Sequence, residues 1–246
     1  MIFGGKDCME QAQTIFKRYE IKYLLDETQY KQMREALTEH MEMDRYGRSR
    51  IYNIYFDTPD FQLIRESLDK PVYKEKLRLR SYGMDKNGGH VFVELKKKYD
   101  GIVYKRREEM AFEEAVEYLY DGKKPSGDSQ ILREIDWFLK YHRHMEPKMY
   151  IAYDRIALAA RDSSGLRITF DDNLCWRNTR LDLQEEGEGH LIIQKGFYLM
   201  EVKTPDALPV WMADILDELK LYPVSFSKYG RAYKEMKEAA ANGTAF

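Results

Sequence analysis

The chain has 246 residues, of which 43% are hydrophobic and 33% charged, enough to bury the core of one large domain. Forty Lys and Arg against 42 Asp and Glu give a net charge of -2, so no overall basic field attracts nucleic acid or anionic membrane, and an anion site must be local. Cys8 and Cys175 lack the spacing of a disulfide framework or a metal knuckle. With no signal core and no apolar run near the roughly 18 residues of a membrane helix, we expect a soluble, cytoplasmic protein.

Alternating polar and apolar residues predict strands through the first half of the chain. The first predicted strand covers residues 14–25. Asp26 follows as the cap of a helix that runs to about His40, with Gln29 as the partner in a capping box. Further strands are predicted over residues 50–57, 73–82, 90–98 and 102–111.

The second half begins with two predicted helices, over residues 113–120 and 129–141, and the latter carries Ile131, Ile135 and Phe138 at helical spacing. Strands follow over residues 148–159, 166–176 and 191–204, and helices over residues 208–220 and 227–240. We find no internal repeat and no second self-sufficient core. The sequence therefore predicts a single α+β domain over residues 1–246.

Charged side chains recur at every second position of the predicted strands, so they share one face of each strand. In the strand over residues 73–82, Lys76, Arg78 and Arg80 project to the same side. A solvated face of an antiparallel sheet explains one such stripe, but like-charged rows repel unless an anion compensates them, and several stripes together favour a bound polyanion. The other stripes are Arg18, Glu20 and Lys22; Glu94, Lys96 and Lys98; Lys105 and Arg107; Arg167, Thr169 and Asp171; and Glu201 and Lys203.

Closure of about eight antiparallel strands into a β-barrel would bring these stripes together in one basic lumen, with the helices packed around the outside. Arg and Lys side chains suit phosphate chains. Inward-facing carboxylates such as Glu201, Glu20 or Glu94 suit Mg²⁺ or Mn²⁺, which commonly bind one or two carboxylates together with phosphate oxygens.

Short motifs follow one another along nearly the whole chain: Phe16-Lys17-Arg18-Tyr19-Glu20-Ile21-Lys22-Tyr23, Tyr55-Phe56-Asp57-Thr58, Lys76-Leu77-Arg78-Leu79-Arg80-Ser81-Tyr82, Val93-Glu94-Leu95-Lys96, Tyr153-Asp154-Arg155, Arg167-Ile168-Thr169-Phe170-Asp171, Glu201-Val202-Lys203 and Ser227-Lys228-Tyr229. In their order they resemble the triphosphate tunnel metalloenzyme (CYTH-like) superfamily. Within it, they are similar to the VTC-type (vacuolar transporter chaperone) polyphosphate polymerase domain. The resemblance implies an eight-stranded antiparallel tunnel.

The resemblance also implies roles for individual residues. Glu201 would bind the metal, and Lys203 is a further candidate for phosphate binding. Tyr153 either stacks on an adenine or packs in the barrel wall, and Arg106 or Arg107 are alternatives to Lys105. The residues that would line the tunnel and hold phosphates are Lys22, Arg78, Arg80, Lys96, Lys105, Arg155, Arg167 and Lys228.

The first motif distinguishes branches of the superfamily. Hydrolytic members begin with Glu-x-Glu-x-Lys, whereas this chain has Arg18 at the first position and keeps Glu20 and Lys22. This departure favours a polymerase that transfers the γ-phosphoryl group of ATP to polyphosphate. The alternatives are an inorganic or organic triphosphatase, with an RNA 5′-triphosphatase disfavoured, and a non-catalytic polyphosphate- or inositol-phosphate-binding module. The yeast relatives sit beside membrane segments, so we expect any membrane coupling here to need a partner.

Overall fold

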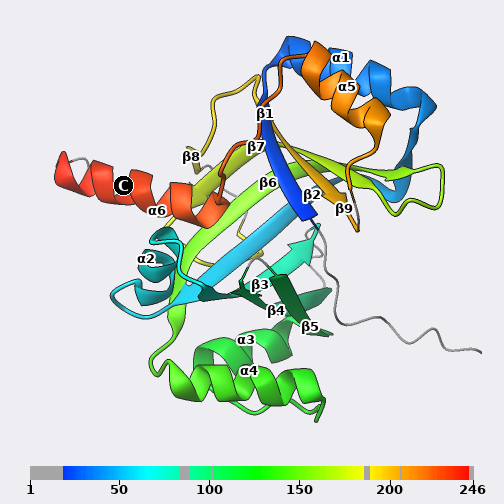
Figure 1. Cartoon of the computed structure of the whole chain (residues 1–246). Helices are drawn as coiled ribbons and strands as arrows, with labels where there is room; N and C mark the ends of the chain where they lie inside the picture. The colour runs from blue at the N-terminus through cyan, green and yellow to red at the C-terminus, as the bar shows by residue number, and fades with distance from the viewer. Residues whose placement is uncertain (1–18, 84–88, 101, 186–188, 206, 244–246) are drawn as a thin grey trace, which may run out of the picture.

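The computed structural model describes residues 19–83, 89–100, 102–185, 189–205 and 207–243, and its centre is one large antiparallel sheet (Figure 1). Within these residues the sheet has nine strands in the order β1-β9-β7-β6-β2-β3-β4-β5, with β8 paired to β7. The strands are β1 (Tyr19–Leu25), β2 (Met41–Asp57), β3 (Tyr73–Tyr82), β4 (His90–Tyr99), β5 (Ile102–Ala111), β6 (Glu146–Ala160), β7 (Arg167–Arg177), β8 (His190–Leu191) and β9 (Tyr198–Thr204).

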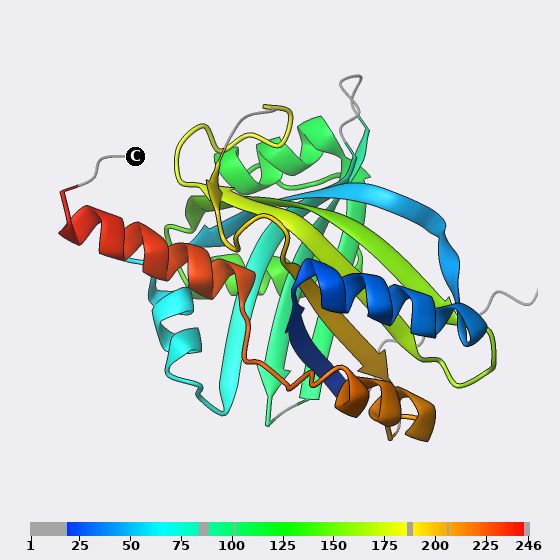
Figure 2. The same ribbon diagram turned by 90° about the horizontal axis from the view of Figure 1, so that it is seen from above.

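The sheet curls so that its two ends, β9 with β1 and β3 to β5, face each other across an inner face (Figures 1 and 2). Among the described strands, β1 and β5 are the two edges, and no backbone ladder joins them. Closure into a barrel is therefore not confirmed. Side chains bridge the gap instead, because Lys96 Nζ on β4 lies 3.9 Å from Glu20 Oε2 on β1.

Strands β2 and β6 form the long spine of the sheet. The sequence predicted only residues 50–57 of β2, which begins at Met41. The register between β2 and β6 shifts between Met43 and Arg48, where Gly47 has a φ of 58°. Such an irregularity bends a strand and interrupts its alternation, which explains why the pattern there was missed. The predicted strand over residues 191–204 is also wrong in its first part, since β8 ends at Leu191 and β9 begins at Tyr198.

Four helices cover the outer face of the curled sheet in two apolar layers. Helices α1 (Glu27–Ala36) and α5 (Val210–Glu218) pack on β1, β7 and β9, while α3 (Phe112–Asp121) and α4 (Gln130–Tyr141) pack on β3 to β5. The predicted capping box of Asp26 and Gln29 is confirmed, and the α1 segment continues as a 3₁₀ turn over Leu37–Glu39. No helix in the described ranges is both long and apolar enough to cross a membrane.

Helices α2 (Gln62–Leu68) and α6 (Lys228–Ala241) pack on the inner face at one end of β2, β6 and β7. Helix α2 was not predicted from the sequence pattern. The buried carboxylate of Asp57 holds this end together, because it accepts hydrogen bonds from the backbone N–H groups of Leu63 and Ile64 and from the hydroxyl of Tyr229. The inner face is thus apolar at one end. The first residue of α6, Lys228, contacts the charged part of the inner face.

Candidate phosphate-binding site

The charged part of the inner face gathers ten cations around four carboxylates. Each carboxylate contacts at least two of the cations, and none of the groups belongs to the outer helical layers. The site therefore carries a large excess of positive charge in a protein whose net charge is -2. The cations are Lys22, Lys76, Arg78, Arg80, Lys96, Lys105, Arg107, Arg155, Lys203 and Lys228, and the carboxylates are Glu20, Glu94, Asp171 and Glu201.

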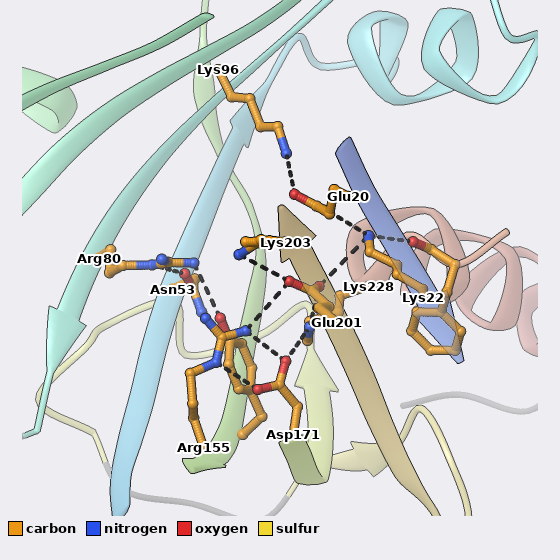
Figure 3. Close-up of polar contacts among 12 residues, drawn as sticks. Glu20, Lys22, Asn53, Arg80, Lys96, Arg155, Asp171, Glu201, Lys203 and Lys228 are labelled. Carbon is orange, nitrogen blue, oxygen red and sulfur yellow. Dashed lines mark hydrogen bonds and ion pairs between the residues drawn. The ribbon is translucent and has the colours of Figure 1, made fainter. Parts of the chain in front are cut away.

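Glu201 on β9 lies at the centre of one group of charges (Figure 3). Its carboxylate oxygens lie 3.3 Å from Lys203 Nζ, 3.5 Å from Lys228 Nζ, 3.6 Å from Lys22 Nζ and 3.9 Å from Arg155 Nη2. Burial alone raises the pKa of a carboxyl, but these cations hold the pKa of Glu201 well below its usual range. Glu201 therefore stays ionised near neutral pH.

Asp171 on β7 is the fully buried partner of Arg155 and Lys228. The guanidinium of Arg155 donates to both carboxylate oxygens, at 2.6 and 2.7 Å, and Lys228 Nζ lies 2.6 Å from Asp171 Oδ2. Arg155 and Lys228 each also reach Glu201. The two acids and two bases thus form one network that fixes the start of α6 against the sheet.

Glu94 on β4 contacts the cations on β3 and β5, at the end of the sheet that faces β9 and Glu201. It is only 1% exposed, and it lies 2.6 Å from Arg78, 2.7 Å from Lys105 and 2.7 Å from Arg107. Burial opposes ionisation, but Arg78 and the neighbouring cations hold the pKa of Glu94 well below its usual range. Glu94 is thus enclosed by cations, and its assignment as a metal ligand stays a prediction.

Several lysines of the site are not fully compensated by carboxylates. Burial, followed by the charges of Lys96 and Lys74, lowers the pKa of Lys76 to about 7. Burial also lowers the pKa of Lys105 to about 8, although Glu94 is adjacent, and it lowers the pKa of Lys96 despite Glu20. An anion bound among these ammonium groups would remove their repulsion.

The structure resolves the alternatives at residues 105–107. Lys105 and Arg107 both contact Glu94 on the inner face, whereas Arg106 points outward to Glu134 of α4 at 2.9 Å. Lys105 and Arg107 therefore both lie on the inner face, and phosphate binding by either one stays a prediction.

Two other predicted residues lie away from the central network. Arg167 is about half exposed and pairs with Asp44 at 2.7 Å. Lys98 lies opposite Lys74 in the ladder, at the end of the basic row. Arg18 lies outside the described residues.

Tyr153 is buried in the wall of the site. Its hydroxyl accepts a hydrogen bond from Arg80 at 3.1 Å, and Lys228 Nζ lies 4.5 Å from the centre of its ring. Asn53 accepts a further hydrogen bond from Arg80 at 2.8 Å, and Ser227 lies 3.1 Å from Lys76. These contacts position the guanidinium and the ammonium, while stacking of Tyr153 on an adenine stays a prediction.

Asp171, Asn53 and Ser227 were not predicted as site residues, and Arg107 was predicted only as an alternative to Lys105. Alternation already placed Asp171 and Arg107 on the charged faces, and this signal could have found them. Asn53 and Ser227 had no such signal, because neither is charged and their partners are remote in sequence.

A divalent cation fits the donor set of the site. Within the described ranges, no three His, Cys, Asp or Glu side chains converge as a metal site. Glu20 and Glu201, however, both lie within 3.6 Å of Lys22 Nζ, and the buried hydroxyl of Thr169 opposite Glu201 lacks a partner. Two carboxylates and an unused hydroxyl match a cation that takes its other ligands from phosphate and water.

Together, the curled sheet and its inner face define a tunnel-type fold whose inner face is rich in basic side chains. The chain matches the VTC domain over residues 17–237 and belongs to that family, within the CYTH-like triphosphate tunnel proteins. Members of this superfamily generally use divalent metal ions.

One solved structure supports this fold. A candidate adenylate cyclase from Bacillus halodurans is 16% identical, with a TM-score of 0.55, over 87% of this chain and 96% of its own. A candidate adenylyl cyclase from Hippeastrum, described as having a dominant triphosphatase activity, is 17% identical, with a TM-score of 0.49, over 92% of this chain and 96% of its own. No curated protein matches the chain.

Proposed function

We propose that the protein is a polyphosphate polymerase that transfers the γ-phosphoryl group of ATP to the end of an inorganic polyphosphate chain, releasing ADP. The observation that carries this proposal is the excess of cations on the facing halves of the inner face. Lys76, Arg78 and Arg80 lie on one side of the inner face, and Lys203 and Lys228 lie on the other. Together these two groups of cations could align a donor and an acceptor phosphate chain. Such alignment converts a bimolecular reaction into one between neighbouring groups.

The chemistry would be mainly electrostatic. Phosphoryl transfer passes through a loose transition state whose charge lies on the transferred group, so positioned cations supply much of the acceleration. Arg78 and Arg155 are suited to this role because Glu94 and Asp171 already hold their guanidinium groups in place. A divalent cation held by Glu201, with Glu20 beside it, would neutralise further phosphate charge.

The ionisation of the acids favours transfer over hydrolysis. A hydrolase needs a base to activate water, and such a base works best with a pKa near the working pH. The pKa values of Glu94 and Glu201 are held well below the usual range, which makes both carboxylates weak bases. Lys76 has a pKa of about 7 in the free protein, but an adjacent phosphate would raise this pKa and keep the ammonium charged. Arg18, where hydrolytic relatives carry a glutamate, is predicted to act in the same direction.

Product analysis tests the proposal. Purified protein with ATP and Mn²⁺ should release ADP and make a ladder of polyphosphate chains on electrophoresis. The variant Glu201→Gln should lose this activity while still binding metal-free tripolyphosphate, because removal of one carboxylate leaves the surrounding cations in place. Phosphate or pyrophosphate without longer chains would establish the triphosphatase alternative. Tight binding without any turnover would establish a non-catalytic polyphosphate-binding module.

A further inference from the structure

Thr169 lies in the middle of β7, on the strand face that carries Asp171. It pairs directly with Glu201 on β9 and with Ala157 on β6. The residue is 1% exposed, and its Oγ1 has no hydrogen-bond partner. A buried hydroxyl is thus left unsatisfied on the residue paired with Glu201, whose carboxylate we assign to the metal.

This hydroxyl differs from the other unpartnered buried atoms in the described part of the chain, which are Nη1 of Arg34 and Nη1 of Arg177. Arg177 uses its remaining nitrogens to donate to three backbone carbonyls, and the guanidinium of Arg34 lies over the rings of Tyr30 and Phe170. Thr169 has only one polar side-chain atom, so its hydrogen-bonding capacity is entirely unused. Leaving such a group buried and unsatisfied destabilises the folded protein.

The chemistry of the neighbours indicates what this hydroxyl could bind. Lysine and arginine groups only donate hydrogen bonds, and the cations around Glu201 are of these two kinds. A hydroxyl can also accept a hydrogen bond. Water molecules bound to Mg²⁺ or Mn²⁺ need such an acceptor, since these cations keep several waters when they bind few protein carboxylates.

We propose that Thr169 is a positioning residue whose hydroxyl accepts a hydrogen bond from a water molecule on the divalent cation held at Glu201. This inference rests on the proposed function, which places the cation there. Groups that orient the ligands of a metal without touching it typically change metal affinity or activity 10- to 100-fold.

The variants Thr169→Val and Thr169→Ser test this role, because valine keeps the shape of threonine without the hydroxyl and serine keeps the hydroxyl. Binding of tripolyphosphate is measured by calorimetry with Mn²⁺ and, separately, with EDTA. Thr169→Val should weaken binding about tenfold with Mn²⁺ and leave binding in EDTA unchanged. Thr169→Ser should bind like the wild type in both conditions.

Thermal denaturation gives a second readout that does not depend on catalysis. Thr169→Val should raise the Tm of the free protein, because it removes an unsatisfied buried hydroxyl. The same variant should show a smaller rise in Tm on addition of Mn²⁺ and tripolyphosphate than the wild type does. A residue that only packs would shift both Tm values equally, and that result would overturn the proposal.

The remaining outcomes separate this inference from the proposed function. Equal weakening of Thr169→Val in Mn²⁺ and in EDTA would make the hydroxyl a phosphate contact and reject the role at the cation. If Thr169→Val binds tripolyphosphate like the wild type, the role of Thr169 is rejected. If Glu201→Gln then loses the effect of Mn²⁺ on tripolyphosphate binding, the metal site at Glu201 is retained. If Mn²⁺ does not improve tripolyphosphate binding even in the wild type, the proposed metal site fails and the role of Thr169 fails with it.

Discussion

The ammonium of Lys76 lies 3.1 Å from the hydroxyl of Ser227, which joins β3 to the start of α6 across 151 positions of sequence. The two residues meet where cations from both halves of the sheet converge. Burial and these cations lower the pKa of Lys76 to about 7, so the free protein holds this lysine in an unfavourable charged state below that pH. The energetic cost should reappear as pH-dependent stability and as proton uptake on binding.

The free energy of unfolding of the free protein should rise between about pH 7 and pH 9. Lys76 has a folded pKa of about 7, below the value of about 10.4 in an unfolded chain, so the unfolded state binds a proton that the folded state has lost. Lys105, with a pKa of about 8, acts in the same direction. Urea denaturation as a function of pH measures this slope, which should be smaller in Lys76→Met. Parallel slopes for the variant and the wild type would contradict the assignment.

Binding of tripolyphosphate at pH 8 should take up protons. The bound anion favours the charged forms of Lys76 and Lys105, whose pKa values lie near or below this pH in the free protein. Calorimetry in two buffers with different ionisation enthalpies gives the number of protons. Lys76→Met should lower that number, and an unchanged number would place the uptake at other groups.

Arg106 and Arg107 provide a matched pair of variants on opposite faces of β5. Arg107 contacts Glu94 on the inner face, whereas Arg106 contacts Glu134 on the outside. Arg107→Ala should weaken tripolyphosphate binding by about tenfold and reduce its salt dependence, because a hydrogen bond to a charged group contributes about 1.5–3 kcal/mol and Arg107 is partly exposed, which favours the lower end of that range. Arg106→Ala should leave both unchanged. Calorimetry at low and high salt measures both quantities. If the two variants weaken binding equally, the polyanion does not bind preferentially to the inner face.

Asp171→Asn should destabilise the free protein by about 3–5 kcal/mol, because it leaves the buried charges of Arg155 and Lys228 without their closest partner. The pKa of Asp171 is lowered, since the effect of burial is outweighed by Arg155 and Lys228, so this stability is present above the unfolded pKa of about 4 and is lost as the pH falls. Arg167→Gln removes an arginine that is about half exposed and should cost less than about 1 kcal/mol. Urea denaturation compares the two, and similar losses would refute the central role of Asp171.

The sequence predicted most strands and the longer helices because their polar and apolar residues alternate or recur at helical spacing. Helix α2 was not predicted because its seven residues are too few to show a helical period. The carboxylate that caps it, Asp57, lies at the end of the preceding strand. The start of β2 was not predicted for a different reason, because the irregularity near Gly47 breaks the alternation of polar and apolar residues. Local pattern thus predicts regular elements and misses those defined by a remote or irregular contact.

The site could be predicted as charged rows but not as a network. Alternation placed Glu201 and Lys203 on one face of a predicted strand, and it placed Lys22 on the charged face of a different strand. Only the pairing of β1 with β9 brings Lys22 opposite Glu201. In the same way, Asp171 belonged to a predicted row, but its two ion pairs come from β6 and α6. Strand pairing and the docking of α6 are non-local, and a single sequence carries no direct signal for either.

Lys22 donates to the backbone carbonyl of Phe226 at 2.9 Å, so the first strand of the described chain and the segment before its last helix meet at the site. Contacts between residues so distant in sequence form slowly, because the intervening chain must be ordered first. During synthesis, β1 emerges long before its partner β9 and before Lys228. A ribosome-bound chain that lacks its last helix would therefore present only part of the basic face, and the capacity to hold phosphate would be acquired only when the C-terminal helix has docked.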